Sequence, residues 1–233
     1  MSKALEAEWS SIEWSEIQTR VIKLQTKIYE ASKSGNKPLV VKLQKTLISS
    51  FSARLVAVRR VTQENKGKRT AGIDGIKSLT PQQRVILAEQ LRLDGKSSPL
   101  RRVEIPKPGK KEKRPLGIPT IEDRAKQALA KLALEPEWEA LFEPNSYGFR
   151  PGRSCHDAIE AIELSIRKKP KYLIDADLKG CFDNIDHEAL IQKLKTFPDM
   201  ETQIRAWLKS GVLVGDVFHK TISPPNFPQG RQE

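Results

Sequence analysis

The sequence contains few cysteines and no long apolar run, and each shortage excludes a class of protein. Only two of the 233 residues are cysteines (Cys155 and Cys181), which excludes a disulfide framework and a cysteine-rich zinc site. No apolar stretch reaches the roughly 18 positions of a membrane-spanning helix, and the polar start MSKALEAEWSSIEW does not resemble a signal peptide. We therefore expect no membrane partner and a reducing, cytoplasmic compartment.

Acidic residues are scarce relative to basic ones. The chain has 41 Lys and Arg residues against 29 Asp and Glu residues, a formal net charge of +12. This excess is larger than solubility requires and indicates a polyanionic partner. The hydrophobic and charged fractions, 38% and 30%, are those of a globular protein long enough to bury a core.

Helical periodicity alternates with strand patterns along the chain, which predicts an α+β fold. A buried strand is expected over 171–176 (KYLIDA), and hairpins are expected over 100–120 and 211–220. Amphipathic helices are expected over 15–33 with Ser15 as cap, 38–61, 81–93, 121–142, 153–167 and 188–209, the last broken at Pro198.

Two basic segments are candidates for phosphate contacts. The glycine-rich loop 63–76 carries Lys66, Lys68 and Arg69, and glycines let backbone N–H groups approach phosphates closely, although a solvated linker would look similar. The hairpin 100–115 has seven cations against two glutamates, a net +5. Its Lys107 and Arg114 favour either binding of a triphosphate or non-specific binding of nucleic acid. Phosphate is the ligand in both cases.

Acidic and aromatic residues supply further candidates. Asp175 and Asp177 would share one face of a strand, as Mg²⁺ ligands do, although they could equally cap the following turn and pair with Lys179. Phe182 has the pattern of a core residue, but a ring beside a metal-bound nucleotide could also occupy the space of a ribose 2′-hydroxyl. The segment NSYGFRPGRS (145–154) combines rings with arginines, which suits either stacking plus phosphate contact or core packing.

Five ordered motifs together carry a family resemblance. They are RTAGIDGI (69–76), LRRVEIPKPGKKEKRPLGIPTIEDRAKQAL (100–129), LEPEWEALFEPNSYGFRPGRS (134–154), YLIDADLKGCFDNIDH (172–187) and FPQG (227–230). This succession resembles the N-terminal half of a group II intron reverse transcriptase and maturase. The resemblance implies a right-hand polymerase fold, with a helical N-terminal extension and RNA-binding loop over 1–95 and fingers with an incomplete palm over 96–233.

The resemblance also assigns roles to individual residues. Asp177 would be the catalytic carboxylate that binds Mg²⁺, with the Leu178 backbone as a second ligand. Phe182 would be the gate against ribonucleotides, and we expect Asp177 to share a cleft with the triphosphate-binding Lys107 and Arg114. Gln229 would lie beside the nucleotide. Contacts with intron RNA, template RNA and primer DNA are expected from Lys66, Lys68, Arg69, Arg101, Arg102, Arg150 and Arg153.

The sequence departs from the family pattern after FPQG. It contains no Tyr-Ala-Asp-Asp, so two of the three metal carboxylates of the family are not found in these 233 residues. The ending is the one expected of a frameshift, a premature stop or a split gene. We expect negligible polymerase activity from this chain alone, with two alternatives: a non-catalytic RNA-binding splicing module, or half of a split reverse transcriptase whose remaining palm is a separate chain.

Overall fold

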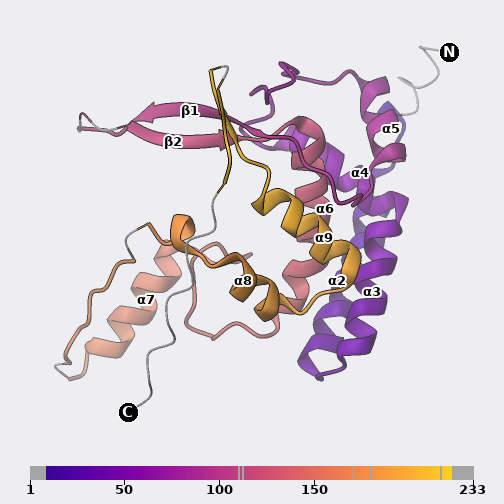
Figure 1. The fold of residues 1–233 in the computed structure, drawn as a ribbon. Coiled ribbons are helices and arrows are strands. Elements are labelled where there is room, and N and C mark those ends of the chain that lie inside the picture. The colour runs from indigo at the N-terminus through magenta and orange to yellow at the C-terminus, as the bar shows by residue number, and fades with distance from the viewer. Residues whose placement is uncertain are drawn as a thin grey trace.

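The computed structural model describes residues 9–221 except positions 110, 112, 170, 179 and 216, and except the side chain of Asp183. It contains a block of packed helices, a small sheet beside it and one helix, α7, that stands apart (Figure 1). The predicted mixed α+β class is confirmed. None of the described helices is long and apolar enough to cross a membrane.

The N-terminal helices form most of the block. They are α2 (Trp14–Lys33), α3 (Lys37–Ser49), α4 (Phe51–Arg59), the π-helical turn η1 (Arg60–Glu64) and α5 (Pro81–Gln90). The helix predicted over 38–61 is interrupted, because Ser50 adopts an extended conformation between α3 and α4. The prediction that Ser15 caps the first helix is wrong as well, because Glu13 is the N-cap residue of α2.

Helix α6 (Ile121–Glu139) packs against α2, α3 and α4 at the centre of the block. Its apolar residues meet those of the surrounding helices in one core, whose largest fully buried apolar side chains are Ile28, Leu47, Leu91, Leu129 and Met200. Burial of this surface is the main contribution to the stability of the block.

A polar network centred on Glu137 also holds α2, α3 and α6 together. Glu137 is 2% exposed, and its carboxylate accepts a 2.6 Å hydrogen bond from Gln44 Nε2 and pairs with Lys37. Ser32 Oγ donates to the Glu137 carbonyl at 2.9 Å. Buried carboxylates are tolerated only with such partners, so this network fixes how the three helices pack.

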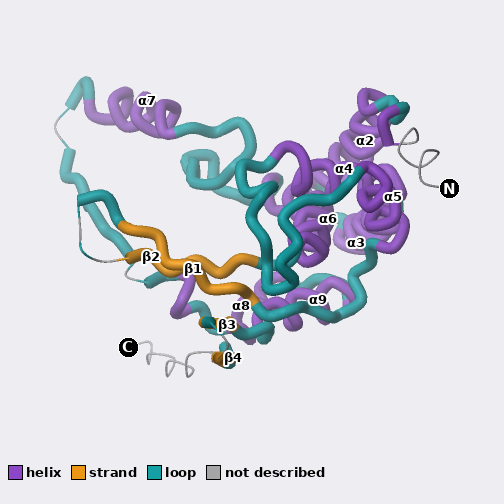
Figure 2. Tube along the Cα trace, turned by 90° about the horizontal axis from the view of Figure 1, so that it is seen from above, coloured by secondary structure: helices purple, strands orange, loops and turns teal. Residues whose placement is uncertain are grey.

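The sheet has four strands in the order β2-β1-β3-β4. Strands β1 (Leu100–Pro106) and β2 (Lys113–Ile118) form the predicted hairpin, and β3 (Val212–Val214) and β4 (Val217–His219) form the second. Strand β1 also pairs in parallel with β3, a contact between distant segments that joins the two hairpins. Figure 2 shows that the β1–β2 hairpin and α7 extend from the same side of the helical block.

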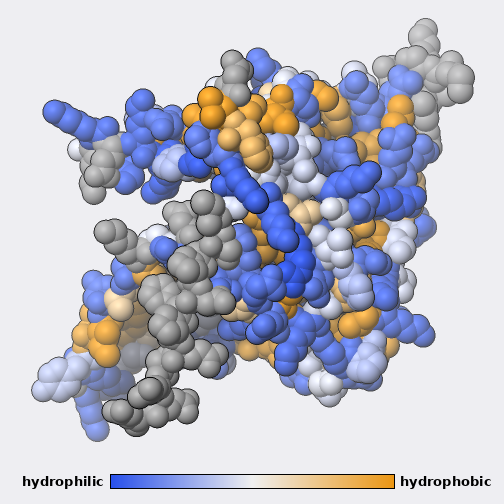
Figure 3. Space-filling model, in the orientation of Figure 1, coloured by the Kyte–Doolittle hydropathy of each residue, from blue (hydrophilic) through white to orange (hydrophobic). Residues whose placement is uncertain are grey.

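Helices α7 (Cys155–Ile166), α8 (His187–Leu194) and α9 (Pro198–Leu208) complete the described chain, with a 3₁₀ turn η2 (Phe182–Asn184) before α8. The strand predicted over 171–176 is wrong: this segment is irregular, and Tyr172 and Ile174 are almost fully exposed. A strand needs a neighbour to satisfy its backbone, and none of the described strands pairs with this segment. Together with the exposed α7, it leaves apolar side chains at the surface (Figure 3).

Candidate nucleic-acid interface

The glycine-rich loop is tied to the start of the β1–β2 hairpin and to the first turn of α6. The Arg124 guanidinium donates to the carbonyls of Gly67 and Thr70 at 2.9 and 2.7 Å. Arg101 Nε donates to the Ala71 carbonyl at 2.9 Å. Two arginines from later segments, β1 and α6, therefore hold the backbone of this loop.

Gly72 lets this loop approach α6 closely. A Cβ at this position would lie 2.7 Å from Thr120 Cα, 2.8 Å from Thr120 N and 2.9 Å from the Pro119 carbonyl oxygen. Thr120 cannot retreat freely, because its hydroxyl caps α6 by accepting from the Asp123 amide. Only glycine fits here without a backbone shift.

The three predicted cations of the loop are presented differently. Lys66 and Arg69 are exposed, whereas Lys68 is half-buried and its ammonium donates to the Gln63 carbonyl at 2.6 Å. Arg101, also predicted to contact RNA, is half-buried and its Nε holds the loop. The loop thus offers two exposed cations on a fixed backbone.

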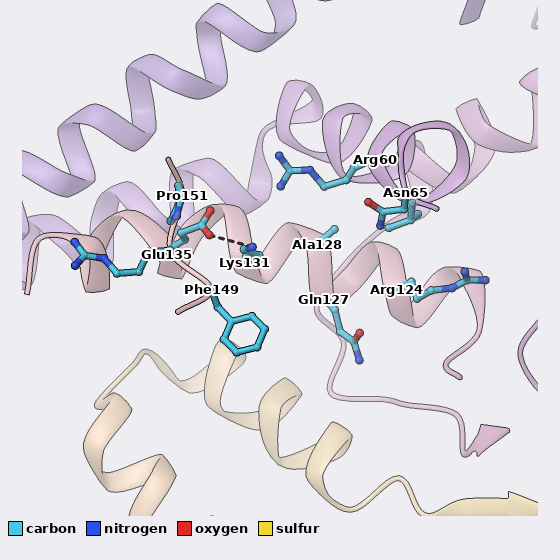
Figure 4. Close-up of a pocket in the computed structure, with 11 residues that line it drawn as sticks. Arg60, Asn65, Arg124, Gln127, Ala128, Lys131, Glu135, Phe149 and Pro151 are labelled. Atoms are coloured by element: carbon cyan, nitrogen blue, oxygen red, sulfur yellow. Dashed lines mark ion pairs between the residues drawn. The ribbon is translucent and has the colours of Figure 1, made fainter. Parts of the chain in front are cut away.

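A cationic groove runs along α6, and we call it the α6 groove. Its volume is about 570 Å³, and Figure 4 shows Arg60, Arg124 and Lys131 around it. Lys131 is paired with Glu135 at 3.0 Å. Phe149 stands at its edge with 97% of its side chain exposed and with φ at +60°, a conformation that costs a bulky residue energy. An exposed ring beside cations suits a nucleobase stacked next to its phosphate.

Arg150 holds the turn that presents Phe149. Its guanidinium forms a two-point pair with Glu139 at 2.6 and 3.1 Å and donates to the carbonyls of Glu143 and Ser146, both at 2.8 Å. The hydrogen bond from Arg150 keeps the pKa of Glu139 below its ordinary value. These bonds use four of the five N–H groups of Arg150, so the residue mainly holds this turn and has little donor capacity left for its predicted contact with RNA.

The neighbouring Arg153 differs from Arg150. It is exposed, and its guanidinium lies over the Tyr147 ring, 5.6 Å from the ring centroid. Its charge faces solvent, as a phosphate contact requires.

A second cavity, of about 670 Å³, lies between the β1–β2 hairpin and the segment that leads into α8, and we call it the hairpin cavity. It brings together Arg102, Arg114 and Phe182, which belong to β1, β2 and η2. Phe182 is 79% exposed, so its interpretation as a core residue is wrong. Arg102 Nε and Trp207 Nε1, on two lining residues, are buried without a hydrogen-bond partner in the described structure.

Other predicted nucleotide-site residues lie outside this cavity. Lys107 is half-buried just after β1, and Asp177 and Leu178 are exposed in the irregular segment; none of the three is among the residues that line the cavity. The expected cleft shared by Asp177, Lys107 and Arg114 is thus not seen around Arg114. Gln229 lies outside the described residues.

The oxygen donors near Asp177 suit Mg²⁺ chemically but supply few ligands. The Asp175 and Asp177 carboxylates and the Leu178 carbonyl are the hard donors this ion prefers. Among the described residues, no group of three or more His, Cys, Asp or Glu side chains could hold a metal. An ion bound here would complete its shell with water and substrate phosphate oxygens.

Sequence reasoning missed two residues that shape this interface. Arg124 lies in the amphipathic pattern of α6 and looks like an ordinary solvated cation, yet it holds the glycine-rich loop. Arg60 follows α4, where the switch to a π-helical turn brings it to the α6 groove. Neither role has a local signal, because both depend on contacts between distant segments.

Comparison with known proteins adds family matches over most of the chain. Residues 9–91 match the family described as the N-terminal domain of reverse transcriptase, and residues 105–230 match the reverse transcriptase (RNA-dependent DNA polymerase) family. Members of the latter family act on nucleic acid and generally use a divalent metal ion.

Individual relatives agree with these matches. The group II intron-encoded protein LtrA of Lactococcus lactis subsp. cremoris is 39% identical over 173 residues, covering 71% of this chain and 28% of the relative. Protein YkfC of Escherichia coli K12 is 39% identical over 152 residues, covering 60% of this chain and 39% of the relative. Maturase-like protein 1 of Euglena gracilis is 30% identical over 195 residues, covering 78% and 41%. The chain spans less than half the length of each of these relatives.

Proposed function

This chain belongs to the reverse transcriptase family of group II intron-encoded proteins, and from that membership we propose that it forms the RNA- and nucleotide-binding part of an RNA-directed DNA polymerase. Intron or template RNA lies along the glycine-rich loop and the α6 groove. A deoxynucleoside triphosphate enters the hairpin cavity.

The hairpin cavity carries the nucleotide part of the proposal. Arg114 supplies a planar guanidinium that can hold two phosphate oxygens, and Arg102 adds a buried N–H without a partner in the described structure. Phe182 places an aromatic ring in the same cavity, where it would exclude a 2′-hydroxyl. Arg114 and Phe182 are distant in the sequence but line one cavity, which supports their proposed roles.

Equilibrium binding of a fluorescent deoxynucleoside triphosphate tests this assignment. Arg114→Ala is expected to weaken binding roughly 10- to 100-fold, the effect of losing one charged hydrogen-bonded contact of about 1.5–3 kcal/mol. Lys111→Ala is the matched control, because Lys111 is an exposed cation of the same hairpin that does not line the cavity. Equal affinities for the two variants would refute the nucleotide site.

The sugar selectivity needs its own measurement. Phe182→Ala should raise the affinity for a ribonucleoside triphosphate toward that for the deoxy form, because the ring no longer occupies the space of the 2′-hydroxyl. Unchanged discrimination between the two nucleotides would remove the gate role of Phe182.

The RNA part of the proposal is supported by the exposed Lys66, Arg69 and Arg153 and by the cations of the α6 groove. Phosphate contacts make affinity fall steeply with salt, by a logarithmic slope of about 0.7 per contacted phosphate of a single strand. Filter binding of intron RNA across a salt series measures this slope, and an affinity insensitive to salt would contradict the electrostatic basis of binding.

Residues 1–233 alone are not expected to polymerise DNA. Asp177 with the Leu178 carbonyl would hold Mg²⁺, which supplies charge stabilisation for phosphoryl transfer, but one carboxylate does not neutralise two such ions. Templated incorporation of deoxynucleotides by the purified chain, abolished by Asp177→Asn, would overturn this expectation.

A second candidate is one half of a split enzyme, favoured by the exposed apolar residues of α7 and of segment 172–178, which a chain carrying the rest of the palm would cover. Adding the remaining C-terminal part of the Lactococcus relative should then restore primer extension. RNA binding without any extension in that mixture would instead favour the non-catalytic splicing module.

A further inference from the structure

A third cationic cavity, distinct from the α6 groove and the hairpin cavity, lies between η1, the glycine-rich loop and the start of α5. Its volume is about 400 Å³, and Lys68, Arg69 and Arg84 line it together with the hydroxyl residues Thr62 and Ser78. We propose that this cavity binds a phosphodiester group of RNA, with Arg84 as the residue that anchors it. The proposal rests on the proposed function and adds to it a discrete phosphate site.

The charges around the cavity are not balanced. Three of its lining residues are cations and none is a carboxylate. The structure shows no ion pair for Arg84 within its described part. Burial lowers the pKa of Arg84, and no carboxylate of the described residues offsets this effect. Arg84 is half-buried, and a partly desolvated charge without a counterion among the described residues is stabilised by an anionic ligand.

The buried cations Lys126 and Arg150 differ from Arg84 because each has a carboxylate partner. Lys126 pairs with Asp94 and Glu122, both at 2.9 Å, and Arg150 pairs with Glu139. Each is neutralised inside the described chain. Among the described residues, Arg84 instead packs on the face of Trp9, whose ring centroid lies 5.8 Å from its guanidinium carbon.

The unsatisfied Nε–H donor of Arg84 also favours an anionic ligand. Its Nε is buried and has no hydrogen-bond partner in the described structure. Buried donors are almost always satisfied, so this N–H is available to an acceptor that the described residues do not supply. Phosphate oxygens are strong acceptors for a guanidinium, and the Ser78 hydroxyl on the same wall adds a donor.

The geometry of Arg84 is held in advance by its neighbours. Trp9 fixes one face of the guanidinium, and Trp9 Nε1 is itself held by a 3.2 Å hydrogen bond to Gln63 Oε1. The threonine cap of α5 fixes the first turn from which Arg84 projects. A pre-organised cation loses little entropy on binding, which favours a specific phosphate site over a diffuse contact.

The position of the cavity favours RNA as the source of the phosphate. Lys68 and Arg69 belong to the glycine-rich loop, which Arg124 and Arg101 hold rigidly. A strand bound along that loop passes the cavity, so one of its phosphodiesters can enter while its neighbours contact the loop.

Nuclear magnetic resonance of the full chain, labelled with ¹⁵N-arginine, tests the site directly. The Arg84 Nε–H resonance is identified by its absence in Arg84→Lys and is followed during titration with inorganic phosphate and with a single-stranded RNA oligonucleotide. A shift in both titrations is expected. A shift with inorganic phosphate alone would overturn the RNA assignment, and no shift in either would overturn the site.

Salt-dependent RNA binding separates this proposal from the proposed function. Arg84→Gln should reduce the logarithmic salt slope by about 0.7, the loss of one phosphate contact. The control Arg20→Gln, at an exposed α2 arginine paired with Glu16, should leave the slope unchanged. Equal slopes for wild type and Arg84→Gln would overturn the site while leaving RNA binding intact. Failure of the wild type to bind RNA would overturn the proposed function, and the titration with inorganic phosphate would still report on the cavity.

Discussion

The attachment of the glycine-rich loop to α6 can be tested at Gly72. In Gly72→Ala, the new methyl group would lie under 3 Å from three backbone atoms of Pro119 and Thr120, none of which can rotate away as a side chain would. Overpacking of this kind costs about 1–3 kcal/mol. For a chain of this size, that corresponds to a fall of about 2–12 °C in the melting temperature.

The same substitution should weaken RNA binding. If the loop moves away from Thr120, the hydrogen bonds from Arg124 and Arg101 to its carbonyls are strained or lost, and the loop cations no longer keep their positions. Loss of the two exposed cations of the loop, Lys66 and Arg69, as phosphate contacts would reduce the salt slope by about 1.4. Thermal unfolding by circular dichroism and filter binding across salt measure the two effects.

Gly67→Ala is the matched control in the same loop. A Cβ at Gly67 has no atom within 4 Å, and the backbone there is not left-handed, so alanine should change stability by less than about 0.5 kcal/mol and leave RNA binding intact. If the two alanine variants behave alike in both assays, close packing of the loop against α6 is not what positions it.

Two further predictions concern the polar contacts of α6. Glu137→Ala should lower the free energy of unfolding by about 2–4 kcal/mol in urea denaturation, because Gln44 Nε2 keeps its bond to the Ala133 carbonyl but loses its carboxylate acceptor, and a cavity opens. Lys131→Ala on the exposed face should change the free energy of unfolding little. Glu139→Gln should lower the melting temperature at pH 7. Because the pKa of Glu139 is depressed in the folded state, its contribution to stability is complete above the unfolded pKa of about 4.3 and is lost as the pH falls through the folded pKa. The melting temperatures of wild type and variant should therefore converge at low pH. A constant difference across pH would refute the role of the ion pair.

Much of the candidate site was predictable because its residues form contiguous motifs. The basic hairpin follows from alternating residues around a Pro-Gly turn, and its Arg114 lines a cavity, although without Lys107 and Asp177. The irregular segment 171–176 was not predictable, because an apolar run reads as a strand whether or not a neighbour pairs with it. The exposure of Phe182 was not predictable either, because the burial of a ring depends on contacts between distant segments.

The sequence by itself determined the helices, the two hairpins, the positive charge and the membership of the family, since each depends on local periodicity, on turn residues or on motifs in order. Only the tertiary structure decided which segments meet. It paired β1 with β3, packed Gly72 against Thr120 and brought Arg114 and Phe182 to one cavity. It also left the Nε of the half-buried Arg84 without a hydrogen-bond partner among the described residues. The physical reason is that burial, close packing and charge compensation arise between residues distant in the chain, and these contacts have no local pattern in the sequence.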